Sequence, residues 1–222
     1  MPHFSEQVDT LERWRRFPGR ERANGAEGVV LTFDDGPDQD ATPAVLDALD
    51  AAGAAATFFL VGEQVESHPA LARELVQRGH DVQLHGYRHV AHDRLAPAAA
   101  RPDLERGARA LREATGREPR FYRPPYGRFS PESYEACGAL GLQAVYWSAW
   151  GTDWETISPQ RIAELVIPDL SAGTVVLLHD SPRYGHRPSA RPTVDALPLI
   201  AASVAGLGMP FLTLAEALDG RD

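Results

Sequence analysis

Short apolar runs alternate with longer amphipathic runs along most of the chain. The apolar runs, rich in β-branched and aromatic residues, predict strands at 29–33, 57–61, 82–84, 120–122, 144–147, 174–178 and 210–213. The amphipathic runs predict helices at 43–51, 69–77, 102–114, 131–140, 159–167 and 193–205. Glycines are expected to end five of these helices, at Gly53, Gly79, Gly116, Gly141 and Gly206. This alternation of strand and helix predicts an α/β fold with a parallel sheet.

Two adjacent carboxylates, Asp34 and Asp35, follow the first predicted strand. Gly36 and Pro37 then predict a turn, which leaves both carboxylates at the carboxyl end of that strand. Parallel α/β folds bind their ligands at this edge. Like charges side by side repel each other unless a cation neutralises them. The pair therefore predicts a metal ion held by one aspartate, with the other free to take a proton from water.

Two histidines four residues apart, His85 and His89, follow the predicted strand 82–84. At that spacing, a helical turn or a tight loop places both rings on the same side. Two imidazoles and one carboxylate suit catalytic Zn²⁺ or a similar divalent ion. The histidine pair alone is equally compatible with a structural role, but together with the two aspartates it favours a metal site. His92 is a competing ligand candidate, and we expect it at the surface or behind the metal ligands.

Five ordered motifs contain these residues and three further groups. They are Thr32-Phe33-Asp34-Asp35-Gly36, His85 to His89, Arg123-Pro124-Pro125-Tyr126-Gly127, Asp153-Trp154 and Leu177-Leu178-His179. With these motifs in this order, the chain resembles the polysaccharide deacetylases, also called the NodB-homology domain or carbohydrate esterase family four. The resemblance runs from about Gly28 to Leu218. Together with the predicted strands it implies a distorted, incomplete (β/α)7-type barrel with parallel strands, in which every motif follows a strand on one face.

A hydrolytic mechanism can be built from these residue types. A divalent cation bound by Asp35, His85 and His89 would polarise an acyl carbonyl and bind the attacking water as nucleophile. Asp34 is placed to act as base, and the metal with a backbone N–H would stabilise the oxyanion. An amine leaves poorly unless it is protonated. His179, at the end of an apolar strand, can supply that proton as acid near neutral pH.

The family resemblance implies further site residues. Arg123 would orient Asp34 through a charged hydrogen bond, and Asp153 would hold and tune His179. The N–H of Tyr126 would contribute to the oxyanion hole. The candidates for contact with the substrate are Trp154 and Leu177, which would wall the acetyl pocket, together with Pro125 and Trp150.

Two positions depart from the common family pattern. Gly86 stands where the metal motif usually carries serine or threonine after its first histidine. That hydroxyl steadies the loop in relatives, so the departure affects loop rigidity and metal affinity, although no ligand is lost. Trp150 stands where many relatives place an additional aspartate, so pocket shape and substrate choice are affected.

Composition and charge narrow the function classes. A net charge of -9 and a pI near 5.4 argue against nucleic acid or an anionic membrane surface as a partner. All 22 basic residues are arginine, which excludes lysine Schiff-base chemistry. The single cysteine, Cys137, cannot form an intrachain disulfide and is expected to be a small packing residue.

No apolar run is long enough to span a membrane, and residues 1–10 lack the apolar core of a signal peptide. The sequence as written therefore predicts a cytoplasmic protein. The resemblance implies the opposite, because many relatives act outside the cell; removal of a leader would make the protein secreted or associated with the cell wall. The oligomeric state is left open.

The length suits one enzyme domain, which we place at residues 28–222. Residues 1–27 differ in character, because Leu11, Trp14 and Phe17 alternate with arginines. We interpret them as an N-terminal extension that forms a short amphipathic helix packed on the barrel.

These observations predict a metal-dependent hydrolase that removes N-acetyl groups from an amino-sugar glycan or glycoside of the peptidoglycan or chitin type. Zn²⁺ is the expected ion, with Co²⁺ and Ni²⁺ as alternatives. One competing hypothesis is an O-acetyl ester hydrolase acting on acetylated xylan, because the same site hydrolyses esters. Another is a non-catalytic carbohydrate-binding barrel, against which the complete set of candidate catalytic residues argues.

Overall fold

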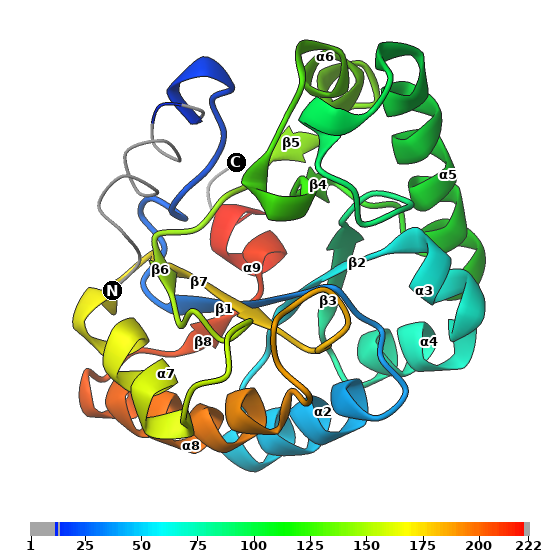
Figure 1. The fold of residues 1–222 in the computed structure, drawn as a ribbon. Coiled ribbons are helices and arrows are strands. Elements are labelled where there is room, and N and C mark those ends of the chain that lie inside the picture. Colours follow the sequence, from blue (N-terminus) through cyan, green and yellow to red (C-terminus); the bar gives the residue numbers. More distant parts are fainter. Residues whose placement is uncertain (1–11, 13, 220–222) are drawn as a thin grey trace.

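One curved sheet of parallel strands organises the molecule (Figure 1). The computed structural model describes residue 12 and residues 14–219 of the 222-residue chain. The strands are β1 Val29–Asp34, β2 Thr57–Leu60, β3 Asp81–Leu84, β4 Phe121–Tyr122, β5 Gln143–Ala144, β6 Ala149–Trp150, β7 Val175–His179 and β8 Phe211–Leu212. They follow the order β5-β4-β3-β2-β1-β7-β6, and β8 pairs with β1. All of these strand pairs are parallel, which confirms the predicted incomplete α/β barrel.

Helices cover the outside of this sheet and connect its strands. They are α2 Ala41–Ala52, α3 Gly62–Ser67, α4 Pro69–Gln77, α5 Pro97–Thr115, α6 Pro131–Ala139, α7 Pro159–Val166, α8 Arg191–Gly206 and α9 Leu214–Asp219. Three short 3-10 turns lie at His92–Arg94, Pro125–Gly127 and Ile167–Asp169. The predicted helices are present, but α3 and α9 were not predicted. Gly206 was wrong as a terminating glycine, because it is still helical and the left-handed φ occurs at Gly208.

Alternate residues of each strand face two different cores. Residues of β1 at odd positions pack in the larger core under the helices, whereas Val30 packs in a smaller core with Val175 of β7 and Leu214 of α9. In Figure 1, α9 lies in the middle of the ring of strands, so this smaller core fills the barrel interior. Asp34 and His179 lie four residues after Val30 and Val175 and share their face. The candidate catalytic residues therefore stand inside the barrel, at the end opposite α9.

Residues shortly before β1 bridge the segment that follows β5 and the segment that precedes β7. Arg20 forms a parallel bridge with Val145, and Arg22 forms an antiparallel bridge with Thr174 just before β7. The Trp14 ring is 5% exposed and stacks on Tyr146 with the ring centroids 4.4 Å apart. Leu11 lies outside the described residues, and the division at residues 27 and 28 stays a prediction.

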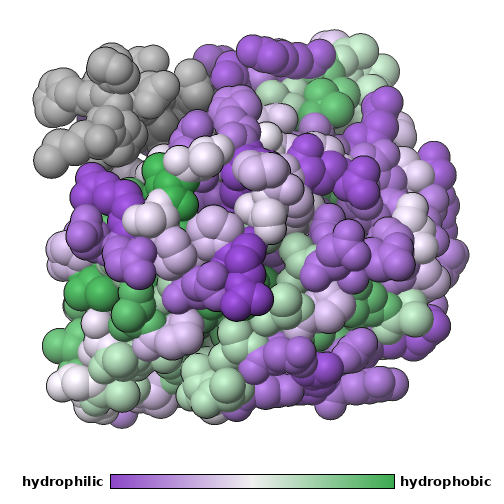
Figure 2. All heavy atoms as spheres, turned by 60° about the horizontal axis from the view of Figure 1, so that its bottom comes forward, coloured by the Kyte–Doolittle hydropathy of each residue, from purple (hydrophilic) through white to green (hydrophobic). Residues whose placement is uncertain are grey.

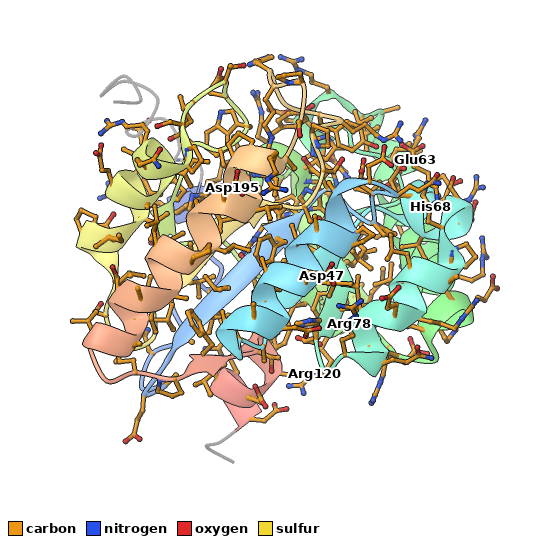
Figure 3. All side chains as sticks on the ribbon, turned by 90° about the horizontal axis from the view of Figure 1, so that it is seen from below. Asp47, Glu63, His68, Arg78, Arg120 and Asp195 are labelled. Carbon is orange, nitrogen blue, oxygen red and sulfur yellow. The ribbon has the colours of Figure 1, made fainter. Side chains whose placement is uncertain are left out.

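One face of the molecule is mainly polar. The face in Figure 2 carries mostly hydrophilic side chains with smaller hydrophobic patches. Arg78, labelled in Figure 3, forms ion pairs at 3.0 Å with Asp47 and 2.9 Å with Asp50 of α2. Within residues 14–219, no helix combines the length and the apolar character needed to cross a membrane.

Candidate active site

The candidate residues meet at the carboxyl ends of neighbouring strands. Parallel pairing places Asp34, the last residue of β1, beside His179, the last residue of β7. His85 directly follows β3, and Arg123 directly follows β4. Because the carboxyl ends of parallel strands share one edge of the sheet, residues far apart in the sequence converge there.

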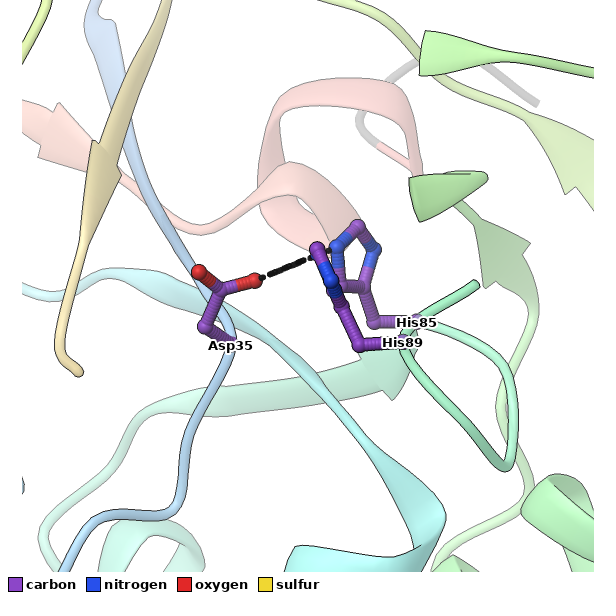
Figure 4. A group of neighbouring side chains, drawn as sticks. All are labelled: Asp35, His85 and His89. Atoms are coloured by element: carbon purple, nitrogen blue, oxygen red, sulfur yellow. Dashed lines mark ion pairs between the residues drawn. The ribbon is translucent and has the colours of Figure 1, made fainter. Parts of the chain in front are cut away.

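Asp35, His85 and His89 form a group that can hold a metal ion (Figure 4). The Oδ1 atom of Asp35 lies 3.0 Å from Nε2 of His89 and 3.5 Å from Nε2 of His85, and the three potential ligand atoms lie within 4.8 Å of one another. That carboxylate oxygen is buried and has no hydrogen-bond partner among the described residues. Burial opposes ionisation, but the two neighbouring imidazoles hold the pKa of Asp35 well below its usual range. A charged, buried oxygen that lies between two imidazoles and lacks a hydrogen bond fits a divalent cation.

The two histidines of this group differ in the hydrogen bonding of Nδ1, the ring nitrogen that does not face Asp35. Nδ1 of His85 donates to the carbonyl of Arg123 at 2.7 Å, which leaves the lone pair of Nε2 facing Asp35. Nδ1 of His89 is buried and has no hydrogen-bond partner within the described part of the chain. The His85 ring is therefore oriented by a hydrogen bond, and the His89 ring is oriented by its packing.

A buried guanidinium holds Asp34. Nη1 of Arg123 donates to Oδ1 of Asp34 at 2.7 Å and to the Thr32 hydroxyl at 2.8 Å. Nη2 of Arg123 donates to the carbonyl of Tyr146 at 2.8 Å, and the side chain is completely buried. The other oxygen of Asp34, Oδ2, lies 3.8 Å from Nε2 of His85. Asp34 is thus fixed through one oxygen and faces the metal group with the other.

A buried carboxylate holds His179. Oδ1 of Asp153 lies 2.8 Å from Nδ1 of His179, and Oδ2 accepts from the His179 backbone N–H at 2.9 Å. Burial alone would lower the pKa of His179, but the charge and hydrogen bond of Asp153, with smaller contributions from Asp35 and Asp34, raise it to about 9. The imidazole therefore keeps a proton through neutral pH.

Arg187 and Thr193 surround Asp153, and the sequence did not indicate either of them. The Thr193 hydroxyl donates to Oδ2 of Asp153 at 2.7 Å, and Nη1 of Arg187 lies 3.4 Å from the same oxygen. Nη2 of Arg187 also donates to the carbonyl of His179 at 3.1 Å. Neither residue belongs to a spacing pattern, so no sequence signal was available to find them.

The predicted substrate-contact residues lie next to His179, on β6 and β7, and after β4. The Trp154 ring stands edge-on to His179, with the centroids 5.6 Å apart. Leu177 is buried and pairs in register with Trp150 of β6. Pro125 is buried, whereas the neighbouring Tyr126 side chain is 57% exposed. Their contacts with a substrate remain predictions.

The loop of the metal motif is braced by Asp103, which the sequence analysis missed. Gly86 has a φ of +82°, and a Cβ atom there would lie 3.1 Å from Oδ2 of Asp103. That oxygen accepts from the Tyr87 backbone N–H at 2.8 Å and lies 3.7 Å from Nε2 of His92. His92 is therefore buried behind the metal loop and is not at the surface. An acidic residue on the buried face of α5 is the signal that indicates such a brace.

Three residues other than glycine have a left-handed backbone in the part of the chain that the structure describes. They are Asp35 (φ 85°), Tyr126 (φ 59°) and Thr152 (φ 51°). Each is a predicted site residue or precedes one, since Thr152 comes directly before Asp153. Such conformations concentrate where surrounding structure and function impose them.

Comparison with known proteins identifies the family of this chain. The sequence matches the family described as polysaccharide deacetylase over residues 21–145. A chitooligosaccharide deacetylase of Bradyrhizobium sp. is 38% identical over 158 residues, which cover 71% of this chain and 72% of that protein. A peptidoglycan-N-acetylglucosamine deacetylase of Bacillus cereus is 34% identical over 191 residues, which cover 86% of this chain and 68% of that protein.

A solved structure extends the similarity to the fold. A family 4 acetyl xylan esterase from Clostridium thermocellum, in complex with a cobalt ion, has a TM-score of 0.78 and 32% identity. The match covers 86% of this chain and 90% of that chain. With the family match over residues 21–145 and these identities, the chain belongs to the polysaccharide deacetylase family.

Proposed function

We propose that the protein is a metal-dependent hydrolase that removes N-acetyl groups from an amino-sugar glycan of the peptidoglycan or chitin type. The observation that carries this proposal is the convergence of the Asp35, His85 and His89 group with Asp34 and His179 at one edge of the sheet. The names of the relatives, a chitooligosaccharide deacetylase and a peptidoglycan-N-acetylglucosamine deacetylase, support this substrate class.

Asp35, His85 and His89 are the residues that would hold the metal. A divalent cation, with Zn²⁺ as our first choice and Co²⁺ or Ni²⁺ as alternatives, would supply Lewis acidity for the acyl carbonyl and for the attacking water. The Arg123 carbonyl keeps Nε2 of His85 free as a ligand atom, because it accepts the proton on Nδ1 at 2.7 Å.

Asp34 acts as the base in this proposal. Its Oδ1 atom is held by Arg123 at 2.7 Å, which leaves Oδ2, next to the metal group, to receive the proton of water. Because Arg123 is completely buried and also donates to Thr32 and to the Tyr146 carbonyl, the base cannot rotate away from the site.

His179 acts as the acid, and Tyr126 as an oxyanion donor. A proton on the imidazole, retained by Asp153, passes to the departing amine nitrogen when the carbon–nitrogen bond breaks. The backbone N–H of Tyr126 would donate to the oxygen that gains negative charge during attack.

The apolar residues of the site would select the acyl group. Leu177 and Trp154 would enclose the acetyl methyl group, and each methylene of a larger acyl group would be disfavoured by roughly 1–3 kcal/mol. Pro125 and Trp150 would contact the sugar. We place the catalytic unit at residues 28–222.

The direct test is acetate release from a chitin tetramer and from purified peptidoglycan. The protein is stripped with a chelator, reloaded with Zn²⁺ or Co²⁺, and compared with Asp34→Asn loaded in the same way. We expect release only from the reloaded wild-type protein. Release from acetylated xylan alone would instead establish the O-acetyl esterase, and no release from any substrate by a metal-loaded protein would overturn hydrolase function.

The substrate also bears on location. Activity on peptidoglycan would require the protein to reach the cell wall, whereas activity confined to small glycosides fits a cytoplasmic protein. Fractionation of cells with an antibody against the chain distinguishes these locations.

A further inference from the structure

The metal-ligand candidate His89 lacks the support that its neighbour His85 has. A histidine that binds a metal through one nitrogen is normally oriented by a hydrogen bond at the other. His85 has that bond, to the Arg123 carbonyl, whereas Nδ1 of His89 is buried without one among residues 14–219. Another contact must therefore fix the His89 ring.

An aromatic ring from a distant loop supplies that contact. The Tyr184 ring stacks on His89 with the centroids 4.0 Å apart and the planes at 12°. The Tyr126 ring also meets His89, at 4.6 Å and 62°. Stacking at this distance restricts rotation of the imidazole, so the direction of Nε2 toward Asp35 depends on where Tyr184 is held.

Tyr184 is itself anchored at the start of α3. Its hydroxyl donates to Oε1 of Glu63 at 3.0 Å and accepts from Nε2 of Gln64 at 3.2 Å. Glu63, labelled in Figure 3, is the second residue of α3. A tyrosine with both hydroxyl contacts satisfied is held more firmly than a ring packed only by its faces.

The same turn of α3 also binds the metal-motif loop. The backbone N–H groups of Gly62 and Glu63 donate to the carbonyls of Gly86 and Tyr87, both at 2.9 Å. The start of α3 is therefore a common support for the loop that carries His89 and for the ring that stacks on it.

The other end of the Tyr184 loop is tied to the acid side of the site. Nη2 of Arg187 donates to the carbonyls of His179 and Ser181 at 3.1 and 3.2 Å. The loop between Ser181 and Arg187 thus starts beside His179 and reaches over to α3.

From these contacts we propose that Tyr184 is a positioning residue that holds the metal ligand His89 in its binding orientation. This inference rests on the metal site of the proposed function. Tyr184 acts through His89 and takes no part in proton transfer.

The test measures metal affinity without substrate. Zn²⁺ dissociation constants are determined by chelator competition, and the visible d–d absorption of the Co²⁺ form reports coordination geometry. Tyr184→Leu removes the stacking ring, and we expect on the order of tenfold weaker Zn²⁺ binding with an altered Co²⁺ spectrum. Tyr184→Phe keeps the ring but loses the anchor to Glu63, so a smaller loss of affinity is expected.

Tyr134→Leu is the matched control. Tyr134 is also partly buried and hydrogen-bonded, through a hydroxyl that donates to the Pro18 carbonyl at 2.8 Å, but it lies on α6. The Tyr134→Leu variant should bind Zn²⁺ as tightly as the wild type. If it loses as much affinity as Tyr184→Leu, general destabilisation explains both variants and the proposal is overturned.

Two further outcomes separate this inference from the proposed function. If Tyr184→Leu binds Zn²⁺ as tightly as the wild type but has a raised KM, Tyr184 contacts the substrate and the positioning role is wrong. If the wild-type protein itself binds no Zn²⁺ or Co²⁺, the metal site of the proposed function fails, and this inference fails with it.

Discussion

The proposed base side and the proposed acid side of the site lie on neighbouring strands but are built in opposite ways. On β1, the carboxylate of Asp34 is held by the guanidinium of Arg123. On β7, the imidazole of His179 is held by the carboxylate of Asp153. Each reactive group is therefore paired with a buried partner of opposite charge.

This reversal shows how one pocket can hold an acceptor and a donor of protons at the same pH. Arg123 has only donors, so it supports Asp34 as a hydrogen-bond acceptor. Asp153 has the reverse effect on the imidazole, because its charge raises the pKa of His179 to about 9 despite burial. In the proposed mechanism, each buried partner therefore supports the role assigned to the group that it holds.

The largest effect is expected from Asp34→Asn, which breaks the base side. The amide oxygen can still accept from Arg123, but it cannot take a proton. Turnover should therefore fall by about 10³-fold, while Zn²⁺ content stays at the wild-type level. Acetate release and metal analysis on the same preparation check the expected turnover and the expected Zn²⁺ content. Near-normal turnover would remove Asp34 from the base role.

A smaller effect is expected from His179→Ala, which breaks the acid side. An amine needs a proton to leave, whereas an activated phenol does not. N-acetyl substrates should therefore lose about 10²-fold in kcat, and an activated acetyl ester less than about tenfold. Measuring both substrates with one preparation tests this prediction; equal losses would mean that His179 positions the substrate.

The smallest effect is expected from Asp153→Asn, which keeps the imidazole but removes its charged partner. Since Asp153 raises the pKa of His179 to about 9, its loss should lower that pKa and move the alkaline limb of kcat/KM toward neutral pH. The loss at pH 7 should be about tenfold and should grow as the pH rises.

Thr193→Val serves as the control for this pH profile. It removes the hydroxyl that donates to Asp153 at 2.7 Å but leaves the carboxylate charge in place, so the limb should move much less. An alkaline limb that stays in place in Asp153→Asn would show that His179 does not set it.

The main strands and the residues at their ends could be predicted because both follow from local patterns. Asp34 and His179 each end an apolar run, and parallel strands bring such ends to one edge. The predicted strand 144–147 was wrong in its extent, because β5 ends at Ala144. Beyond it, the Tyr146 N–H donates to the carbonyl of Arg20 at 2.7 Å, so a segment far away in the sequence takes over the pairing.

The supporting residues of the site could not be predicted in the same way. Tyr184 and Arg187 lie in one loop whose sequence has no periodic pattern. Thr193 begins a segment whose pattern predicts a helix and gives no sign of a contact with the site. Their roles arise from contacts across the molecule, to Glu63, Asp153 and His89. Asp103 did carry a signal, because a carboxylate on the buried face of a helix requires a partner.

The left-handed residues around the site set a limit for laboratory evolution. Asp35, Tyr126 and Thr152 hold a φ that glycine adopts freely, and each costs on the order of 1 kcal/mol in this conformation. The Thr152 hydroxyl is also buried without a partner among the described residues. Selection for thermal tolerance alone would therefore favour replacing them, and selection for turnover would retain Asp35. Heat resistance and catalysis therefore compete at Asp35, whereas Tyr126 and Thr152 are positions where a more robust variant of this hydrolase could gain stability.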